Sequence, residues 1–170
     1  DVQGAHTGEV SVLQLKELGV KVVSLGHPER RHTYEEDDSM INRKVKLALP
    51  HGLEVILCVG ELLEEREAGK AEKVCEEQTR LGLAGVSLED LKKVTIAYEP
   101  VWAIGTGKTA TPEDADAIHA FIRKIVADMY GAAAAEAMII QYGGSMKADN
   151  AAALLAKANI DGGLIGGAAL

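Results

Sequence analysis

Polar side chains and glycines follow the apolar runs of this sequence at the points where those runs end. The positions are Gly26-His27, Gly60-Glu61, Glu99-Pro100, Gly143-Gly144-Ser145 and Gly166-Gly167. They supply a carboxylate, an imidazole and glycine-rich loops. A carboxylate can remove a proton from carbon, an imidazole can donate a hydrogen bond to a carbonyl oxygen, and loop amides can bind an anion. These residue types provide a possible base, a hydrogen-bond donor and anion-binding loops at the ends of the predicted strands.

Glu99 is the candidate base. It follows the apolar run Val94 to Tyr98 and precedes Pro100, which fixes the backbone where the predicted strand ends. The alternative interpretation is a strand-end carboxylate paired with a basic residue.

His27 is the candidate hydrogen-bond donor to the carbonyl. It follows a predicted strand and precedes Pro28-Glu29, which is typical of a helix start. The positive end of a helix dipole disfavours imidazolium, so we expect a neutral ring that can donate a hydrogen bond. The other histidines are expected on the surface or in packing: His6, His32, His51 and His119.

Strand-like and helix-like segments alternate along the chain. Short β-branched runs predict strands over Val20 to Leu25, Glu54 to Val59, Val94 to Tyr98, Met138 to Gln141 and Asp161 to Ile165. Apolar residues three and four apart predict helices over Glu9 to Leu18, Asp38 to Leu49, Leu63 to Leu83, Pro112 to Tyr130 and Lys147 to Ala156. This alternation predicts a parallel sheet covered by helices.

The sheet could be open and doubly wound, or closed into a barrel. Polar residues after nearly every strand favour a barrel, because all the loops at the strand ends then meet at one mouth. No GxGxxG motif supports a dinucleotide site. A complete barrel has eight strands, whereas this sequence predicts only five.

Composition excludes several partners. The net charge of −8 and the absence of a basic stripe argue against nucleic-acid binding. No apolar run reaches the roughly 18 residues that cross a membrane. Cys58 and Cys75 lack metal-ligand spacing, and no secretory leader is recognised, so we expect two reduced thiols in a cytoplasmic protein.

Six segments resemble those of triosephosphate isomerases, in order and at matching spacing. They are GAHTGE (4–9), LGHPERR (25–31), CVGE (58–61), AYEPVWAIGTGKTATP (97–112), QYGGS (141–145) and IDGGLIGGAAL (160–170). The resemblance implies one partial (β/α)8 TIM-barrel domain over residues 1–170 that holds strands four to eight. The family's N-terminal third and its last helix are then expected to be missing.

The resemblance also implies a function. The family interconverts D-glyceraldehyde 3-phosphate and dihydroxyacetone phosphate, a step of glycolysis, through an enediolate and without a metal or organic cofactor. It implies that Glu99 is the base, that His27 is the electrophile and that Glu29 is a second carboxylate near the site. Glu29 could instead form a surface ion pair with Arg30 or Arg31.

Family resemblance further implies that Gly105, Ser145, Gly166 and Gly167 bind the substrate phosphate, and that residues 101–109 form a lid. The GAHTGE segment resembles the loop that reaches into a neighbouring subunit, with Thr7 at its tip, which implies a homodimer in the complete protein.

Two departures from the family pattern bear on activity. No segment matches the region that carries the family's electrophilic Lys and its companion Asn, and Lys108 and Lys147 belong to other motifs. Pro28 stands where the family usually has Ser, so we expect altered positioning of Glu99. The alternative function is therefore a catalytically incompetent fragment or an interaction module derived from the same family.

Overall fold

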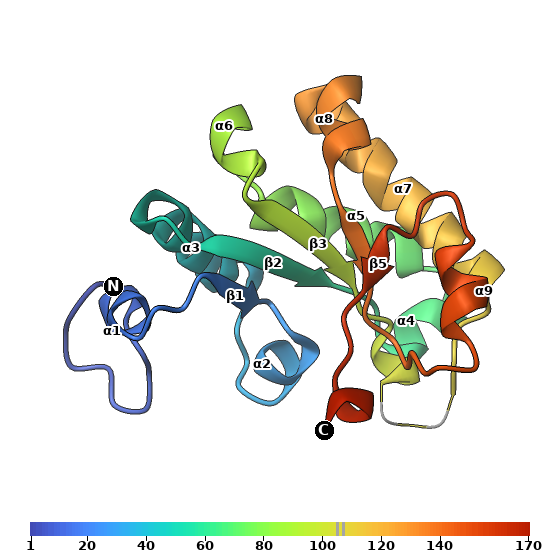
Figure 1. The fold of residues 1–170 in the computed structure, drawn as a ribbon, viewed down its shortest axis with the longest axis horizontal. Coiled ribbons are helices and arrows are strands. Elements are labelled where there is room, and N and C mark those ends of the chain that lie inside the picture. The colour runs from blue at the N-terminus through green and yellow to red at the C-terminus, as the bar shows by residue number, and fades with distance from the viewer. Residues whose placement is uncertain (105, 107) are drawn as a thin grey trace.

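The computed structural model describes residues 1–104, 106 and 108–170. Within them, parallel strands form a single sheet in sequential order (Figure 1). The strands are β1 (Val22–Leu25), β2 (Glu54–Val59), β3 (Val94–Tyr98), β4 (Ile140–Tyr142) and β5 (Gly162–Gly163). Each strand pairs with the next along the chain, as in consecutive units of a (β/α)8 barrel. The predicted α/β class and incomplete barrel are confirmed.

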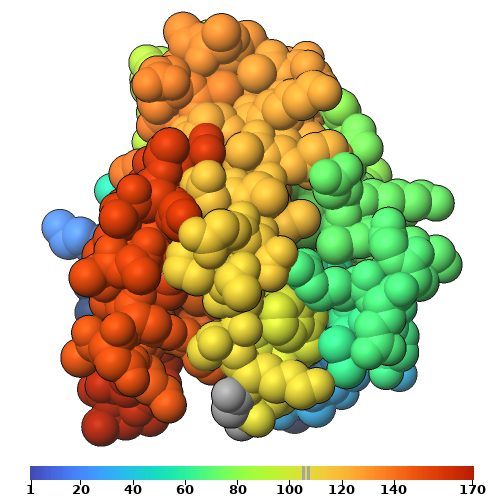
Figure 2. All heavy atoms as spheres, turned by 90° about the vertical axis from the view of Figure 1, so that its right-hand side faces the viewer, coloured from blue at the N-terminus to red at the C-terminus, as the bar shows by residue number. Residues whose placement is uncertain are grey.

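Helices connect the strands. They are α1 (Val12–Glu17), α2 (Pro28–His32), α3 (Asp38–Ala48), α4 (Leu63–Glu67), α5 (Ala71–Gly82), α6 (Leu88–Leu91), α7 (Pro112–Tyr130), α8 (Ala132–Ala137) and α9 (Ala151–Leu155). Short 3-10 turns are η1 (Leu49–His51), η2 (Val101–Ala103) and η3 (Gly167–Ala169). Neighbouring helices α3, α5 and α7 pack side by side and lie behind the sheet in Figure 1. Figure 2 shows the outer surface, where α7 lies between the C-terminal residues and the α4–α5 region and α8 lies at the top.

Alternate strand residues face the helices and form the core. Leu57, Ile96, Tyr98, Ile140 and Tyr142 are fully buried in one apolar cluster. Because side chains alternate across a strand, Ser24, Cys58 and Ala97 lie on the opposite face of the sheet. That face leads to the strand ends where the predicted site residues follow.

Helix ends follow the predicted signals. Thr111 caps α7 by accepting a hydrogen bond from the Asp114 N–H, and Pro112 occupies the first helical position. Gly19 follows the end of α1 with φ of 76°, a conformation that glycine adopts without strain.

Some predicted boundaries are wrong. The helix expected over Leu63 to Leu83 is two helices, because Gly69 adopts φ of 70° and ends α4. The helix expected from Lys147 begins at Ala151, after a turn in which the Lys147 N–H donates to Asn150 Oδ1 at 2.7 Å.

Two further differences concern short elements. The strand expected over Asp161 to Ile165 pairs only at Gly162–Gly163. The short helices α6 and α8 were not predicted, and α8 consists almost entirely of alanine, which carries no periodic pattern.

Candidate active site

A cavity of about 470 Å³ lies at the carboxyl ends of the strands. Its lining brings together His27, Glu99, Ser145, Gly166 and Gly167, which come from four different strand-to-helix loops. Lys147 also lines it, which was not predicted. Five of the seven predicted site residues therefore share one cavity.

Glu99 is buried at this cavity, with 2% of its surface exposed. Its Oε2 lies 3.3 Å from Nε2 of His27, and among the described residues its Oε1 has no hydrogen-bond partner. Burial raises the pKa of Glu99, although the nearby Cys58 thiol and His27 oppose that shift. A desolvated carboxylate with a free oxygen is a stronger base than one in water.

His27 is held by the start of α2. The backbone N–H of Glu29 donates to His27 Nδ1 at 3.2 Å, and Pro28 occupies the first helical position. Since Nδ1 accepts this hydrogen bond, the hydrogen of a neutral ring resides on Nε2. That Nε2–H faces Glu99 and the cavity, which is the orientation needed to donate to a substrate oxygen.

Glu29 lies apart from the other candidates. Its side chain is exposed in the first turn of α2 and does not line the cavity. Among the described residues, neither Arg30 nor Arg31, the alternative ion-pair partners, pairs with Glu29. Arg30 binds Glu36 and Glu9, and Arg31 binds Asp38 at 2.6 Å.

The candidate phosphate loops occupy the other wall of the cavity. Ser145 donates from both its hydroxyl and its N–H to the Ala103 carbonyl, at 2.7 and 3.0 Å. Gly167 begins η3, and the first N–H groups of a helical turn have no acceptor within the turn. Gly105 lies outside the described residues, as does part of the expected lid over residues 101–109.

Cys58 and Ser24 also lie next to the candidate base or its cavity, and neither was predicted. The Cys58 thiol is fully buried at the end of β2, with Sγ 3.2 Å from Ser24 Oγ and the carboxyl of Glu99 nearby. Burial first, and then the charge of Glu99, raises the pKa of Cys58 well above its ordinary range, so the thiol stays protonated. The signal available in the sequence was its place in the CVGE segment, just before a strand end.

Glu61 is a buried carboxylate beside the site. Its Oε1 accepts from Tyr98 OH at 3.0 Å and from Trp102 Nε1 at 2.9 Å, and it pairs with Arg66 at 3.3 Å. The Arg66 guanidinium also stacks 4.8 Å over the Trp102 ring. These contacts fix the residues on both sides of Glu99.

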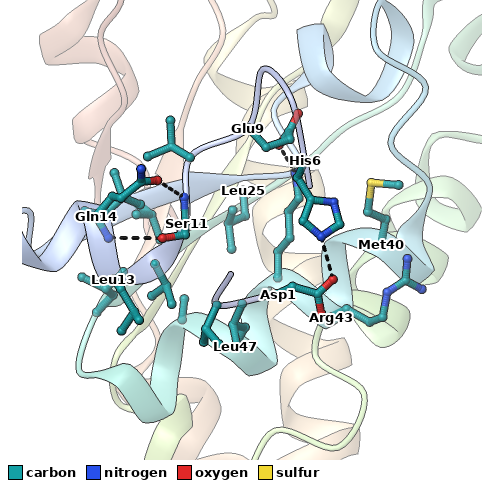
Figure 3. A pocket seen from close by; sticks show the side chains of 18 of the residues that line it. Asp1, His6, Glu9, Ser11, Leu13, Gln14, Leu25, Met40, Arg43 and Leu47 are labelled. Carbon is teal, nitrogen blue, oxygen red and sulfur yellow. Dashed lines mark hydrogen bonds and ion pairs between the residues drawn. The ribbon is translucent and has the colours of Figure 1, made fainter. Parts of the chain in front are cut away.

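A larger hollow of about 890 Å³ lies elsewhere, between the N-terminal residues, α1, β1 and α3 (Figure 3). Its walls carry Leu13, Leu25, Met40 and Leu47, and none of the seven predicted site residues. By volume alone this hollow would be the candidate active site, but the smaller cavity is lined by Glu99 and His27. We therefore place the chemistry at the smaller one.

Residues 1–104, 106 and 108–170 contain no group of three or more His, Cys, Asp or Glu side chains that could hold a metal ion. None of the helices there is long and apolar enough to cross a membrane.

A parallel sheet with a carboxylate, an imidazole and glycine loops at its strand ends defines a barrel-type enzyme. The sequence model of the triosephosphate isomerase family matches residues 1–170. The chain is 74% identical to the triosephosphate isomerase of Treponema denticola, over 99% of this chain and 67% of that protein. It is 65% identical to that of Treponema pallidum and 57% identical to that of Chloroherpeton thalassium, over 98% and 99% of this chain and 67% of each relative. The chain belongs to the triosephosphate isomerase family and spans about two thirds of its relatives' length.

Proposed function

We propose that this chain carries the base, the electrophile and the phosphate loops of an isomerase that interconverts D-glyceraldehyde 3-phosphate and dihydroxyacetone phosphate. The observation that carries the proposal is the pair Glu99 and His27, 3.3 Å apart at a cavity whose other wall is formed by glycine loops. Its relatives bear the name of the same activity.

The geometry supports a two-step proton transfer. Glu99 takes the proton from the carbon next to the carbonyl, and the electron pair of that C–H bond moves to form the enediolate. His27 donates a hydrogen bond from Nε2–H to the carbonyl oxygen, which stabilises the developing charge. Glu99 then returns the proton to the former carbonyl carbon. The hydroxyl hydrogen of the adjacent carbon moves to the former carbonyl oxygen through Nε2 of His27, so that substrate and product differ only in the positions of hydrogens and of the carbonyl.

We assign the phosphate group of the substrate to the glycine loops that line the same cavity. The amides of Gly166 and Gly167 are the first candidates, with Gly105 and Ser145 beside them, because loop amides bind dianions and loops after the last two strands form the usual phosphate site of such barrels. The Ser145 N–H would exchange its hydrogen bond to the Ala103 carbonyl for one to the phosphate. Glu29 is assigned a supporting role through its N–H, which orients His27. A homodimer with Thr7 at its interface and a cytoplasmic location complete the proposal.

Turnover of glyceraldehyde 3-phosphate by the purified chain tests this function, with Glu99→Gln prepared in parallel as the control. We expect activity in the parent chain and a loss of about 10³-fold or more in the variant, because the amide cannot accept the proton. The kcat/KM of the parent should fall as the pH drops through the raised pKa of Glu99, since only the carboxylate is a base. Equal rates in both proteins would support the alternative, a noncatalytic fragment.

A further inference from the structure

The CVGE segment at the end of β2 has no assigned role in the reaction, yet it is in direct contact with the backbone of the base. A Cβ atom at Gly60 would overlap the backbone carbonyl oxygen of Glu99. Gly60 has an ordinary negative φ, so glycine is needed here for space and not for its backbone conformation. The absent side chain therefore lets the two strand ends approach at Glu99.

A side chain from α5 holds Gly60 in place. Gln78 Oε1 accepts from the Gly60 N–H at 2.8 Å, and Gln78 Nε2 donates to the Gly60 carbonyl at 3.3 Å. One amide thus binds both polar groups of a single residue. Two hydrogen bonds in this arrangement fix the orientation of the peptide groups on both sides of Gly60, which a single bond would leave free to rotate.

Residues on either side of Gly60 bind the backbone around the base. The Glu99 N–H donates to the Val59 carbonyl at 2.7 Å, and the Val101 N–H donates to the Glu61 carbonyl at 3.1 Å. The contacts are therefore consecutive: Val59 binds the Glu99 N–H, Gly60 lies against the Glu99 carbonyl, and Glu61 binds the Val101 N–H. The backbone of Glu99 has little freedom while Gly60 is held.

We propose that Gln78 and Gly60 are positioning residues that set the place of the Glu99 carboxylate through its backbone. The inference rests on the proposed function, in which Glu99 is the base. Gln78 lies 21 residues before Glu99 in the sequence and outside the cavity, so it acts through Gly60 and not on the substrate. Misplacement of a base by about 1 Å can cost on the order of 10²-fold in rate.

The first test compares kcat and KM for Gly60→Ala, Gln78→Met and Gln78→Glu. We expect kcat to fall about 100-fold in Gly60→Ala and about 10-fold in Gln78→Met, with KM changed less than about twofold, because the phosphate loops do not contact either residue. Gln78→Glu should lie between Gln78→Met and the parent, since it keeps the acceptor for the Gly60 N–H and loses the donor. Gln78→Met keeps the test valid if Gly60→Ala fails to fold.

Matched controls separate positioning from general damage. Glu77→Met changes the adjacent exposed residue of α5, and Gly162→Ala adds a Cβ whose nearest neighbour, in the Gln141 side chain, lies at an ordinary 3.6 Å. Both should keep the parent kcat. A kcat that is unchanged in Gln78→Met, or a KM that rises while kcat is unchanged, would overturn the proposal.

A second readout does not depend on turnover. Titration of the ¹³C-labelled Glu99 carboxyl by NMR, assigned by its loss in Glu99→Gln, should show a lower pKa in Gln78→Met than in the parent, because a displaced carboxyl gains solvent. If the parent chain has no isomerase activity, the proposed function fails, and this titration still decides the positioning role. Identical titration in the parent and in Gln78→Met would refute that role.

Discussion

Burial acts in opposite directions on two titratable residues of this chain. Glu99 becomes a stronger base because removing its carboxylate from water favours the proton-bound form and raises its pKa. His119 is fully buried, and removing its ring from water favours the neutral form and lowers its pKa to about 4. Glu99 opens onto a cavity, whereas His119 is enclosed between α7 and the strands, with its ring centroid 5.7 Å from that of Tyr98. A buried carboxylate such as Glu99 can react because it borders a cavity, whereas an enclosed histidine such as His119 contributes only to packing.

The His119 site predicts acid-sensitive folding. Its Nδ1–H donates to the Asn159 carbonyl at 3.1 Å, and the charged groups around it are Asp116, Asp161 and Arg123. Because its pKa falls from the ordinary 6.5 to about 4, the unfolded chain binds a proton more readily than the folded chain between these values. The stabilisation from neutral His119 is complete above about pH 6.5 and is lost as the pH falls towards 4, a change of up to about 3 kcal/mol in the free energy of unfolding.

Urea unfolding across that pH range measures the effect. In His119→Phe the ring cannot titrate, and the Asn159 carbonyl keeps its hydrogen bond from Arg123, so the fall in stability with acid should be shallower than in the parent. His32→Gln, a change at an exposed histidine, should follow the parent. Parallel curves for His119→Phe and the parent would show that His119 does not drive the acid sensitivity.

The bounds of several helices and strands could be predicted from local sequence patterns, whereas contacts between elements could not. β2, β3 and α7 have the predicted bounds because each has a strong apolar pattern and clear end signals such as Thr111-Pro112. The break at Gly69 was missed because a helical pattern continues on both sides of it, and β5 is shorter than expected because its glycines offer no side-chain pattern. The meeting of His27, Glu99, Ser145, Gly166 and Gly167 at one cavity could be predicted because these residues follow parallel strands. The contact of Gln78 with Gly60 could not, because helical periodicity does not say which strand residue a helix side chain reaches.

We expect the hydrogen bonds of Glu61, which link the end of β2 to Tyr98 and to Trp102 of η2, to stabilise the fold. We call this contact the joint. Glu61 accepts hydrogen bonds from Tyr98 and Trp102, and its replacement by Leu leaves the buried Tyr98 hydroxyl without that acceptor. An unsatisfied buried donor costs about 1–3 kcal/mol, so Glu61→Leu should lower the free energy of unfolding by about 2–5 kcal/mol. Glu61→Gln keeps an oxygen for both donors and should cost less.

Trp102 is the single tryptophan of the chain, so its fluorescence reports this joint directly. We expect Glu61→Leu to change the emission maximum and to lower the unfolding midpoint, and Glu61→Gln to stay close to the parent on both measures. Equal effects of the two substitutions would mean that the charge of Glu61, paired with Arg66, matters more than its hydrogen bonds.

The sheet formed by the described residues is open and not closed into a barrel. β1 and β5 each pair with one neighbour, so each leaves a row of N–H and C=O groups along its outer edge. β1 is the longer of the two edges, and its Val22 is 45% exposed. Exposed strand edges pair readily with other chains. The large hollow of Figure 3 lies along this same edge, which adds apolar surface for such contacts.

The polypeptide of these 170 residues is therefore expected to associate through β1 as its concentration rises, and sedimentation velocity measures this. Val22→Lys places a charge on the exposed edge, and it should shift the distribution towards monomer because pairing would bury that charge. Thr7→Arg tests the competing surface, the exposed loop proposed for the homodimer. If Thr7→Arg disperses the assembly and Val22→Lys does not, the loop and not the strand edge holds the subunits together. If Val22→Lys alone disperses it, the association is a property of the open sheet.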